Sequence, residues 1–307
     1  MDNEMIEKVL LAHVAEQRRA RRWGNFWRFA TFGVSLVVLI GIFWGDAATV
    51  SHVPTSRHTA LVTVDGVISS DSAASADVLG ESLRMAFENK AAAGVILRVN
   101  SPGGSPVQSG IVFDEIRRLK ALHQDKPVIA VIEDVGASGG YYVAAAADSI
   151  YVDKASLVGS IGVRLDSFGF TEALKKLGVE RRLLTAGENK AMLDPFLPVD
   201  PKQKSSMQSM LNEVHEQFIV AVKQGRGDRL SQSPELFSGM VFTGARSISL
   251  GLADGFGTID SVARDVIKAE EIVDYTVQPS LAERLAKRFG ASMGEAFAKV
   301  MSGWSVY

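Results

Sequence analysis

Two apolar segments, GVILRV at residues 94–99 and PVIAVIE at residues 127–133, decide the fold class of this chain. Both are nearly continuous in apolar and β-branched residues, which is typical of strands that are covered on both faces of a sheet. Amphipathic helical patterns at residues 76–90 and 106–123 separate them from each other and from a strand pattern at residues 60–68. This alternation predicts an α/β domain with a largely parallel sheet.

The same alternation continues toward the C-terminus, with more widely spaced elements. We expect a strand at residues 149–153, a helix at 170–177, a strand at 180–185, a long helix at 201–225 and a last strand region ending at 275–278.

Two loops rich in small residues each follow one of the apolar strands: NSPGGS at residues 100–105 and GASGGYY at residues 136–142. The carboxyl ends of parallel strands are where α/β sheets bind ligands. Ser138 is followed by glycines and a helix-forming run, so its hydroxyl is expected at a helix N-terminus, where negative charge is favoured. We interpret Ser138 as a candidate nucleophile. Gly103 and Gly104 are candidates for an oxyanion hole, because bare backbone can approach a substrate carbonyl.

A serine nucleophile requires a base, and the sequence offers two kinds. Residues 136–140 match G-x-S-x-G, so a Ser-His-Asp hydrolase would use His215, although that histidine lies within an amphipathic helical pattern. The other known base is lysine. A free lysine has a pKa of about 10.4, and lowering it by about 3 units requires about 4 kcal/mol of stabilisation of the neutral amine, through burial. Lys190, in a loop with apolar residues beyond it, is the candidate.

Composition excludes several other classes of site. The chain has 307 residues, no cysteine, five histidines and a formal charge of -2. The absence of cysteine excludes disulfides, thiolate metal sites and cysteine nucleophiles. No HExxH or GxxxxGK motif occurs, so no metal, nucleotide or other cofactor is expected. The charge balance gives no reason to expect a nucleic-acid partner.

The N-terminal part resembles a membrane anchor. Residues 29–45 form an uncharged apolar run that as a helix would extend about 25 Å. Residues 1–28 form a basic leader, which by the positive-inside rule keeps the N-terminus cytoplasmic. A cleaved signal peptide, with a site at 45–47, is the alternative. Residues 46–57 are a predicted linker, and residues 58–278 the main domain outside the cytoplasm.

The C-terminal segment, residues 279–307, has an amphipathic helical pattern. Apolar residues recur four apart at Leu281, Leu285, Phe289, Met293, Phe297 and Met301. Such a stripe is typical of a core or oligomer contact, and a helix lying on a membrane is the alternative.

Four motifs in order, taken together, resemble one family. They are NSPGGS, the long segment GASGGYYVAAAADSIYVDKASLVGSIGV at residues 136–163, AGENKAM at residues 186–192, and GMVFTGARSISLGLADGFG at residues 239–257. With the single apolar N-terminal run, they resemble the bacterial signal peptide peptidase A family, membrane-anchored serine proteases of the S49 type. The resemblance covers residues 58–275.

The resemblance implies a fold of the ClpP and crotonase type, built from repeated ββα units, and a Ser-Lys dyad. Ser138 would be the nucleophile, Lys190 the general base, and Ser160 the hydroxyl that orients the lysine amine. Gly103 and Gly139 would supply the oxyanion N–H groups. Asp254 and Gly251 match a family signature, and we expect them to fix a turn rather than to act in catalysis.

The resemblance also implies a biological setting. The substrates would be remnant signal peptides in the membrane, the chain would form a cyclic homo-oligomer, and the protease domain would face the periplasm from the bacterial inner membrane. The competing hypothesis is a membrane-anchored, non-enzymatic scaffold that keeps the fold for assembly and binding.

Overall fold

The computed structural model describes residues 18–19, 21–37 and 55–277. The chain divides into two units, one formed by residues 54–278 and the other by residues 1–53 together with 279–307. Of the second unit, the described part is helical. The following paragraphs concern the first unit.

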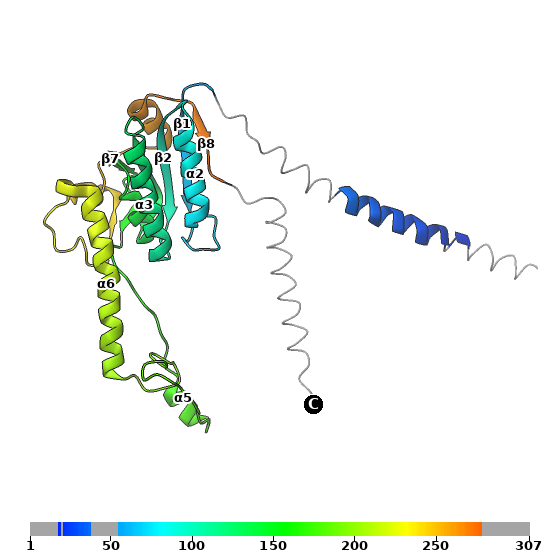
Figure 1. Ribbon diagram of the computed structural model, residues 1–307, viewed down its shortest axis with the longest axis vertical. Coiled ribbons are helices and arrows are strands. Elements are labelled where there is room, and N and C mark those ends of the chain that lie inside the picture. Colours follow the sequence, from blue (N-terminus) through cyan, green and yellow to red (C-terminus); the bar gives the residue numbers. More distant parts are fainter. Residues whose placement is uncertain (1–17, 20, 38–54, 278–307) are drawn as a thin grey trace, which may run out of the picture. The chain divides into compact units, whose positions relative to one another are not determined.

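A single mixed sheet forms the centre of this unit (Figure 1). Its strands are β1 (His58–Asp65), β2 (Ala92–Ser101), β3 (Val128–Ala137), β4 (Ser149–Val152), β5 (Leu157–Gly159), β6 (Val241–Thr243), β7 (Gly255–Phe256) and β8 (Ile272–Asp274). The main order is β6-β5-β3-β2-β1-β8, with β4 pairing β3 and β7. All pairs are parallel except β5 with β6. The prediction of a largely parallel α/β sheet is confirmed.

Helices connect the strands. They are α2 (Ala76–Glu88), α3 (Pro106–Leu122), α4 (Gly139–Ala144), α5 (Thr171–Lys176), α6 (Pro201–Arg226), α7 (Gly244–Ser249) and α8 (Ile259–Ser261), with a 3-10 turn η2 (Gly227–Arg229) and a π-helical turn η3 (Val262–Ile267). Local sequence sets their starts: the Ser75 and Ser105 hydroxyls accept hydrogen bonds from the first turns of α2 and α3. The helices expected at 76–90, 106–123 and 201–225 are confirmed.

The central strands are buried on both faces, as their apolar runs predict. Val95 and Leu97 of β2 point into a large core that includes α2, α3, α4 and the end of α6. Ile96, between them, points into a smaller core on the other face, formed with η3. All three side chains are fully buried. This double burial is what holds the carboxyl ends of β2 and β3, and hence the two glycine loops, in fixed positions.

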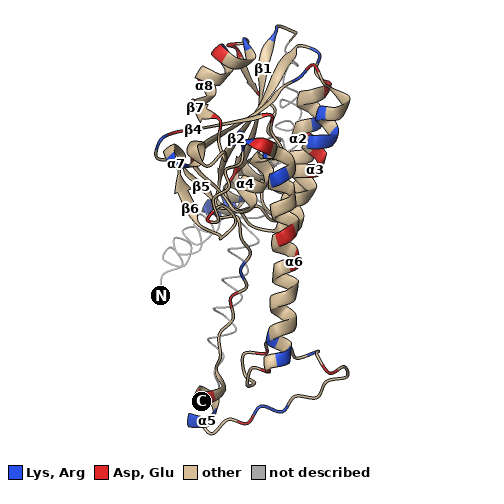
Figure 2. Cartoon of the chain, turned by 90° about the vertical axis from the view of Figure 1, so that its left-hand side faces the viewer, with Lys and Arg blue, Asp and Glu red and all other residues tan. Residues whose placement is uncertain are grey.

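A long excursion leaves this body after β5 and returns on α6. No residue from Gly162 to Gln217 is buried, and we call this segment the arm. Figure 1 shows α6 running from the body to α5, and Figure 2 shows α5 beyond β5 and β6 on the side away from β1. The strand predicted at residues 180–185 is wrong, because no strand of the described part of the chain lies beside this stretch to pair with it; Leu184, for example, is 98% exposed.

The terminal predictions fall largely outside the described residues. Of the apolar run at 29–45, residues 29–37 are helical and residues 38–45 lie outside the described part. Among the described residues, no helix combines the length and apolar character needed to cross a membrane. The C-terminal stripe at 281–301 also lies outside them.

Candidate active site

Ser138 occupies a sharp turn between β3 and α4. Its backbone has φ 51° and ψ -122°, a conformation that costs a non-glycine residue about 1–3 kcal/mol. Neighbouring bonds hold it there: the Ser138 N–H donates to the Gly159 carbonyl at 2.8 Å, and the Ser138 carbonyl accepts from the Tyr142 N–H at 2.9 Å. The side chain is half-buried, and it makes no capping bond to α4. The turn therefore presents a hydroxyl at the N-terminus of a helix, as the sequence predicts.

The first glycine loop packs directly on this turn. A β-carbon at Gly103, where φ is 101°, would lie 2.7 Å from both the Gly139 nitrogen and the Ser138 β-carbon. A β-carbon at Gly139 would lie 2.4 Å from the Ser109 Oγ and 3.2 Å from the Gly104 nitrogen. Side chains at Gly103 or Gly139 would force the two loops apart. Glycine is needed at both positions because the backbones of the two loops are in direct contact, which leaves no room for a β-carbon.

The N–H groups around Ser138 differ in whether they are already used. The Gly103 N–H donates to the Ser101 Oγ at 3.2 Å, and that hydroxyl donates to the Gly66 carbonyl at 2.6 Å. Within residues 55–277, no acceptor is found for the N–H of Gly104 or of Gly139. Two free donors therefore lie at the Ser138 turn, and the Gly103 N–H would join them by leaving Ser101 for a charged oxygen, which is the stronger acceptor.

Ser160 lies one residue beyond the carbonyl that holds Ser138. It also has a positive φ, 51°, and its N–H donates to the Met240 carbonyl at 2.7 Å. In the described part of the chain, neither the Ser138 nor the Ser160 hydroxyl has a hydrogen-bond partner. The structure thus brings Ser160, Gly103 and Gly139 to the surroundings of Ser138. Their roles stay predictions.

A buried ion pair, Arg226–Asp254, lies close to the loop that holds Tyr141 of α4. The fully buried Arg226 donates to both carboxylate oxygens of Asp254, at 2.8 and 2.9 Å, and to the Gly251 carbonyl. The Tyr141 hydroxyl, whose pKa is raised by burial, stays protonated and donates to the Leu252 carbonyl at 2.8 Å. Because Tyr141 lies three residues after Ser138, within α4, this contact fixes α4. Gly251 lies in a turn with φ 78°, and Asp254, three residues on, also accepts a hydrogen bond from the Ile150 N–H at 2.7 Å.

Burial alone would raise the pKa of Asp254. The Arg226 hydrogen bonds, the Ile150 N–H and the charges of Arg226 and Arg229 outweigh burial, and they hold the pKa below its ordinary value. The carboxylate is therefore charged at neutral pH, and the buried guanidinium is compensated.

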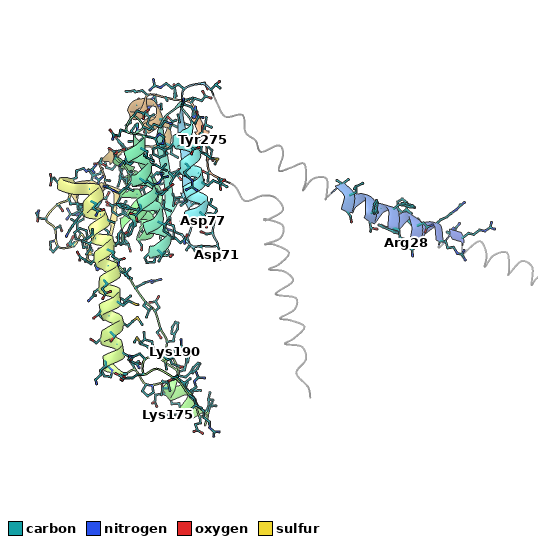
Figure 3. The ribbon with its side chains drawn as sticks, viewed as in Figure 1. Arg28, Asp71, Asp77, Lys175, Lys190 and Tyr275 are labelled. Carbon is teal, nitrogen blue, oxygen red and sulfur yellow. The ribbon has the colours of Figure 1, made fainter. Side chains whose placement is uncertain are left out.

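Lys190 lies elsewhere. It is exposed on the arm, in a series of tight turns in which its N–H donates to the Gly187 carbonyl at 3.1 Å. Figure 3 shows Lys190 near Lys175 and α5, away from the sheet. A cavity of about 400 Å³ near this loop is lined by arm residues alone, including Glu188 and Asp194. One copy of the chain therefore does not bring the predicted base to the predicted nucleophile.

His215 does not take its place. Its ring Nε2 lies 3.0 Å from the Ile161 carbonyl oxygen, which accepts a hydrogen bond from it. No hydrogen bond between His215 and Ser138 is found among the described residues, so the Ser-His-Asp alternative gains no geometric support. The histidine instead ties α6 to the point where the arm leaves the body.

The sequence reasoning missed two residues that shape the site. Ser101 engages the Gly103 N–H, and Ser109 lies under Gly139. Both are fully buried; Ser101 belongs to NSPGGS, and Ser109 lies four residues after that motif, in the first turn of α3. The double glycine close to Ser101 was the only signal available for it, since a serine there is equally typical of a turn. Nothing in the sequence marked Ser109, which lies within a helical pattern.

Comparison with known proteins identifies related sequences. Residues 120–273 match the sequence model described as peptidase family S49. A Na(+)/H(+) antiporter NhaA from Brucella melitensis is 50% identical over 182 residues, which are 59% of this chain and 25% of that protein. The chain thus spans only a quarter of the length of that relative.

Two other relatives are named as proteases. A protein from Methanocaldococcus jannaschii, named as a candidate protease, is 32% identical over 216 residues, which are 68% of each chain. The chloroplastic serine protease SPPA of Arabidopsis thaliana is 33% identical over 187 residues, 61% of this chain and 27% of that protein.

Proposed function

Because this chain belongs to peptidase family S49, we propose that it is a serine endopeptidase with Ser138 as its nucleophile. The observation that carries the proposal is the turn at Ser138, where a strained serine starts a helix beside unpaired backbone N–H groups. A structural serine has no need of this arrangement. A nucleophile does, because the donors must be in place where negative charge develops.

We assign the general base to Lys190 of another copy of the chain. A lysine amine removes a proton only when it is neutral, which requires its removal from water. Lys190 is exposed within its own chain and lies on the arm. Docking of the arm on a neighbouring body would both bury the amine and bring it to Ser138. The proposed dyad is therefore formed between subunits.

Exposed apolar side chains on the arm support this assembly. Phe168 is 76% exposed, Leu177 75% and Leu184 98%. Large apolar surface of this kind is typical of a protein contact. Repeated head-to-tail contacts of one copy with the next close into a ring when the rotation permits. We therefore propose a cyclic homo-oligomer; a monomer with full activity after detergent extraction would contradict it.

The proposed reaction is acyl transfer. Lys190 takes the proton of the Ser138 hydroxyl, and the oxygen attacks a peptide carbonyl. The N–H groups of Gly139 and of a glycine in the NSPGGS loop stabilise the oxyanion, and the protonated lysine returns the proton to the leaving amine. Water, activated by the same amine, then hydrolyses the acyl-enzyme. Ser160 would orient the amine.

We also propose a fold family, a substrate class and a location in the cell. The parallel strands with helical connections, and the glycine loops that follow β2 and β3, suit a fold of the ClpP and crotonase type. Remnant signal peptides are the proposed substrates, because they are apolar and lie in the membrane. Residues 29–45 would be the anchor in the bacterial inner membrane, with the N-terminus cytoplasmic and residues 58–278 in the periplasm.

The deciding experiment is covalent labelling of the full chain with a serine-directed acylating probe. We expect Ser138 of the wild type to be labelled, and Lys190→Ala to reduce the labelling rate by at least about 10³-fold without loss of fold. Lys175→Ala, at an exposed lysine of α5 on the same arm, is the matched control and should react like the wild type. A wild type that never becomes labelled would favour the non-enzymatic scaffold.

A further inference from the structure

The two ends of α6 differ in burial. Every buried residue of this helix lies in its last part, from Phe218 to Arg226, whereas its first part belongs to the exposed arm. At about 1.5 Å per residue, the helix extends for about 39 Å. It therefore connects the body to the distant part of the arm as a single rigid element (Figure 1).

The body end of α6 is seated on α4, the helix that begins at the residue after Ser138. The Tyr142 ring of α4 stacks on the Phe218 ring of α6, with centroids 4.7 Å apart and planes inclined by 19°. The Phe113 ring of α3 contacts the Tyr142 ring edge to face, with centroids 5.4 Å apart. Three helices are thereby joined at one point.

A second contact brings the backbones of α4 and α6 together. A β-carbon at Gly225 would lie only 1.8 Å from the carbonyl oxygen of Ala145, the residue that ends α4. Neither atom belongs to a flexible side chain, so no rotamer change could relieve this overlap. Gly225 is therefore what permits α6 to lie directly against the end of the nucleophile helix.

A small error at this junction is magnified along the helix. The distance from Gly225 to the first turn of α6 is about 36 Å, so a tilt of about 10° displaces the far end by about 6 Å. A general base must lie within about 3 Å of the proton that it removes. The seating of α6 on α4 therefore sets the position of everything that the arm carries.

We propose that Gly225 is a positioning residue, which seats α6 on the nucleophile helix so that the arm presents Lys190 in register with the Ser138 of a neighbouring copy. The inference rests on the proposed function for its catalytic consequence. The position of the arm relative to the body, in contrast, can be measured without any catalysis.

The test is an arm-to-body distance, measured by electron spin resonance on the full-length chain. Because the chain has no cysteine, spin labels can be placed at Glu81→Cys on α2 and Ser206→Cys on α6, both exposed sites. Labelled protein is diluted with unlabelled protein, so that only distances within one chain are observed. Wild type should give one narrow distance distribution.

Gly225→Ala should shift or broaden that distribution by about 5 Å, as the length of the helix dictates. Gly225→Ala should also lower the rate constant for acylation of Ser138 about 10²-fold. The probe concentration needed for half saturation should change little. Gly110→Ala, at a helical glycine whose β-carbon would meet only the Tyr142 hydroxyl at 3.8 Å, should leave both unchanged.

Phe218→Leu serves as the second variant if Gly225→Ala does not fold. It keeps an apolar side chain and removes the stacked ring, so it should broaden the same distance distribution. A folded Gly225→Ala with the wild-type distribution overturns the inference, and so does a displaced arm with an unchanged acylation rate. A wild type that is never acylated overturns the peptidase proposal instead, and the distance result still decides the seating of α6.

Discussion

The helix α6 passes through two surroundings that differ in almost every respect. Between Phe218 and Arg226 it buries aromatic, aliphatic and charged side chains against α4 and the turn at Asp254. In the arm, the same helix has no buried residue, and the surrounding loops leave large apolar side chains exposed. The body has its own buried core within one chain. The arm is held by a few local contacts, and exposed apolar surface of this kind is typical of a contact with another molecule.

This difference also separates the two predicted catalytic residues. The turn at Ser138, the predicted nucleophile, is held by backbone hydrogen bonds and by close contacts between glycines, so it is preformed. The predicted base, Lys190, is exposed and has no such support among the described residues. An active site divided in this way would be assembled only when copies of the chain meet.

The largest effect is expected at Gly139, where a substitution tests whether the turn at Ser138 is preformed within the body. Gly139→Ala places a β-carbon 2.4 Å from the Ser109 Oγ, so the turn and its N–H donors must move. Loss of an oxyanion donor costs about 10²–10³-fold, and we expect the rate of Ser138 acylation to fall by about 10²-fold. Adding Ser109→Ala removes the nearest atom and should recover part of the rate. An unchanged rate in a folded Gly139→Ala would contradict the preformed site.

The ion pair at Asp254 provides the next test. Removing one partner of a fully buried ion pair costs about 3–5 kcal/mol. The Asp254 side chain is 22% exposed, so we expect a smaller loss. Asp254→Asn should lower the free energy of unfolding by about 2 kcal/mol. For a unit of this size, that lowers the melting temperature by about 4–8 °C. Asp166→Asn breaks an exposed ion pair with Arg164 on the arm, and it should change the free energy of unfolding by less than about 0.5 kcal/mol.

The pH dependence of this effect has a definite sign. The folded pKa of Asp254 lies below its unfolded value, so its contribution to stability is complete above about pH 4 and declines as pH falls through the folded pKa. The difference between wild type and Asp254→Asn should therefore shrink in acid. Denaturant titrations at several pH values check this, and a difference that grows in acid would contradict the assignment.

The smallest effect is expected on the arm. The Phe196 N–H and the Arg181 guanidinium, bonded to Asp194 at 2.9 and 3.1 Å, hold the pKa of that carboxyl below its ordinary value. Asp194→Asn should leave the melting temperature of the body unchanged, because the arm contributes no buried residue. Hydrogen exchange of the amides at 170–196 should nevertheless become faster.

The exposed pair of Lys175 and Glu172 on α5 gives the matched control. Glu172→Gln should alter exchange only within α5. If Asp194→Asn lowers the melting temperature of the body, the arm is not the separate region that its exposure indicates.

Local sequence was sufficient for the parts of the fold that are locally determined. Apolar runs such as VILRV and serines before helices specify the strands and helix starts of the body, and small residues after the strands predicted the turn at Ser138. The strand expected at 180–185 is not formed, because within residues 55–277 no other strand pairs with this stretch, and pairing is a property of tertiary structure.

The candidate site was predictable to the same extent. The positions of Ser138, Gly103 and Gly139 follow from the parallel sheet, because the ends of neighbouring strands meet. The separation of Lys190 from Ser138 could not be predicted, since sequence spacing says nothing of a segment that leaves the body. Nor could the contact of Gly225 with Ala145, which depends on how two distant helices pack.

Co-expression of Ser138→Ala with Lys190→Ala, followed by hydrolysis of an apolar peptide ester, tests most directly whether the active site is shared between the body of one copy and the arm of another. Each variant alone should be inactive. In mixed assemblies with head-to-tail contacts, about a quarter of the sites would combine an intact serine with an intact lysine, so about a quarter of the wild-type activity should return. Mixed assemblies that form normally and remain inactive would contradict a dyad formed between subunits.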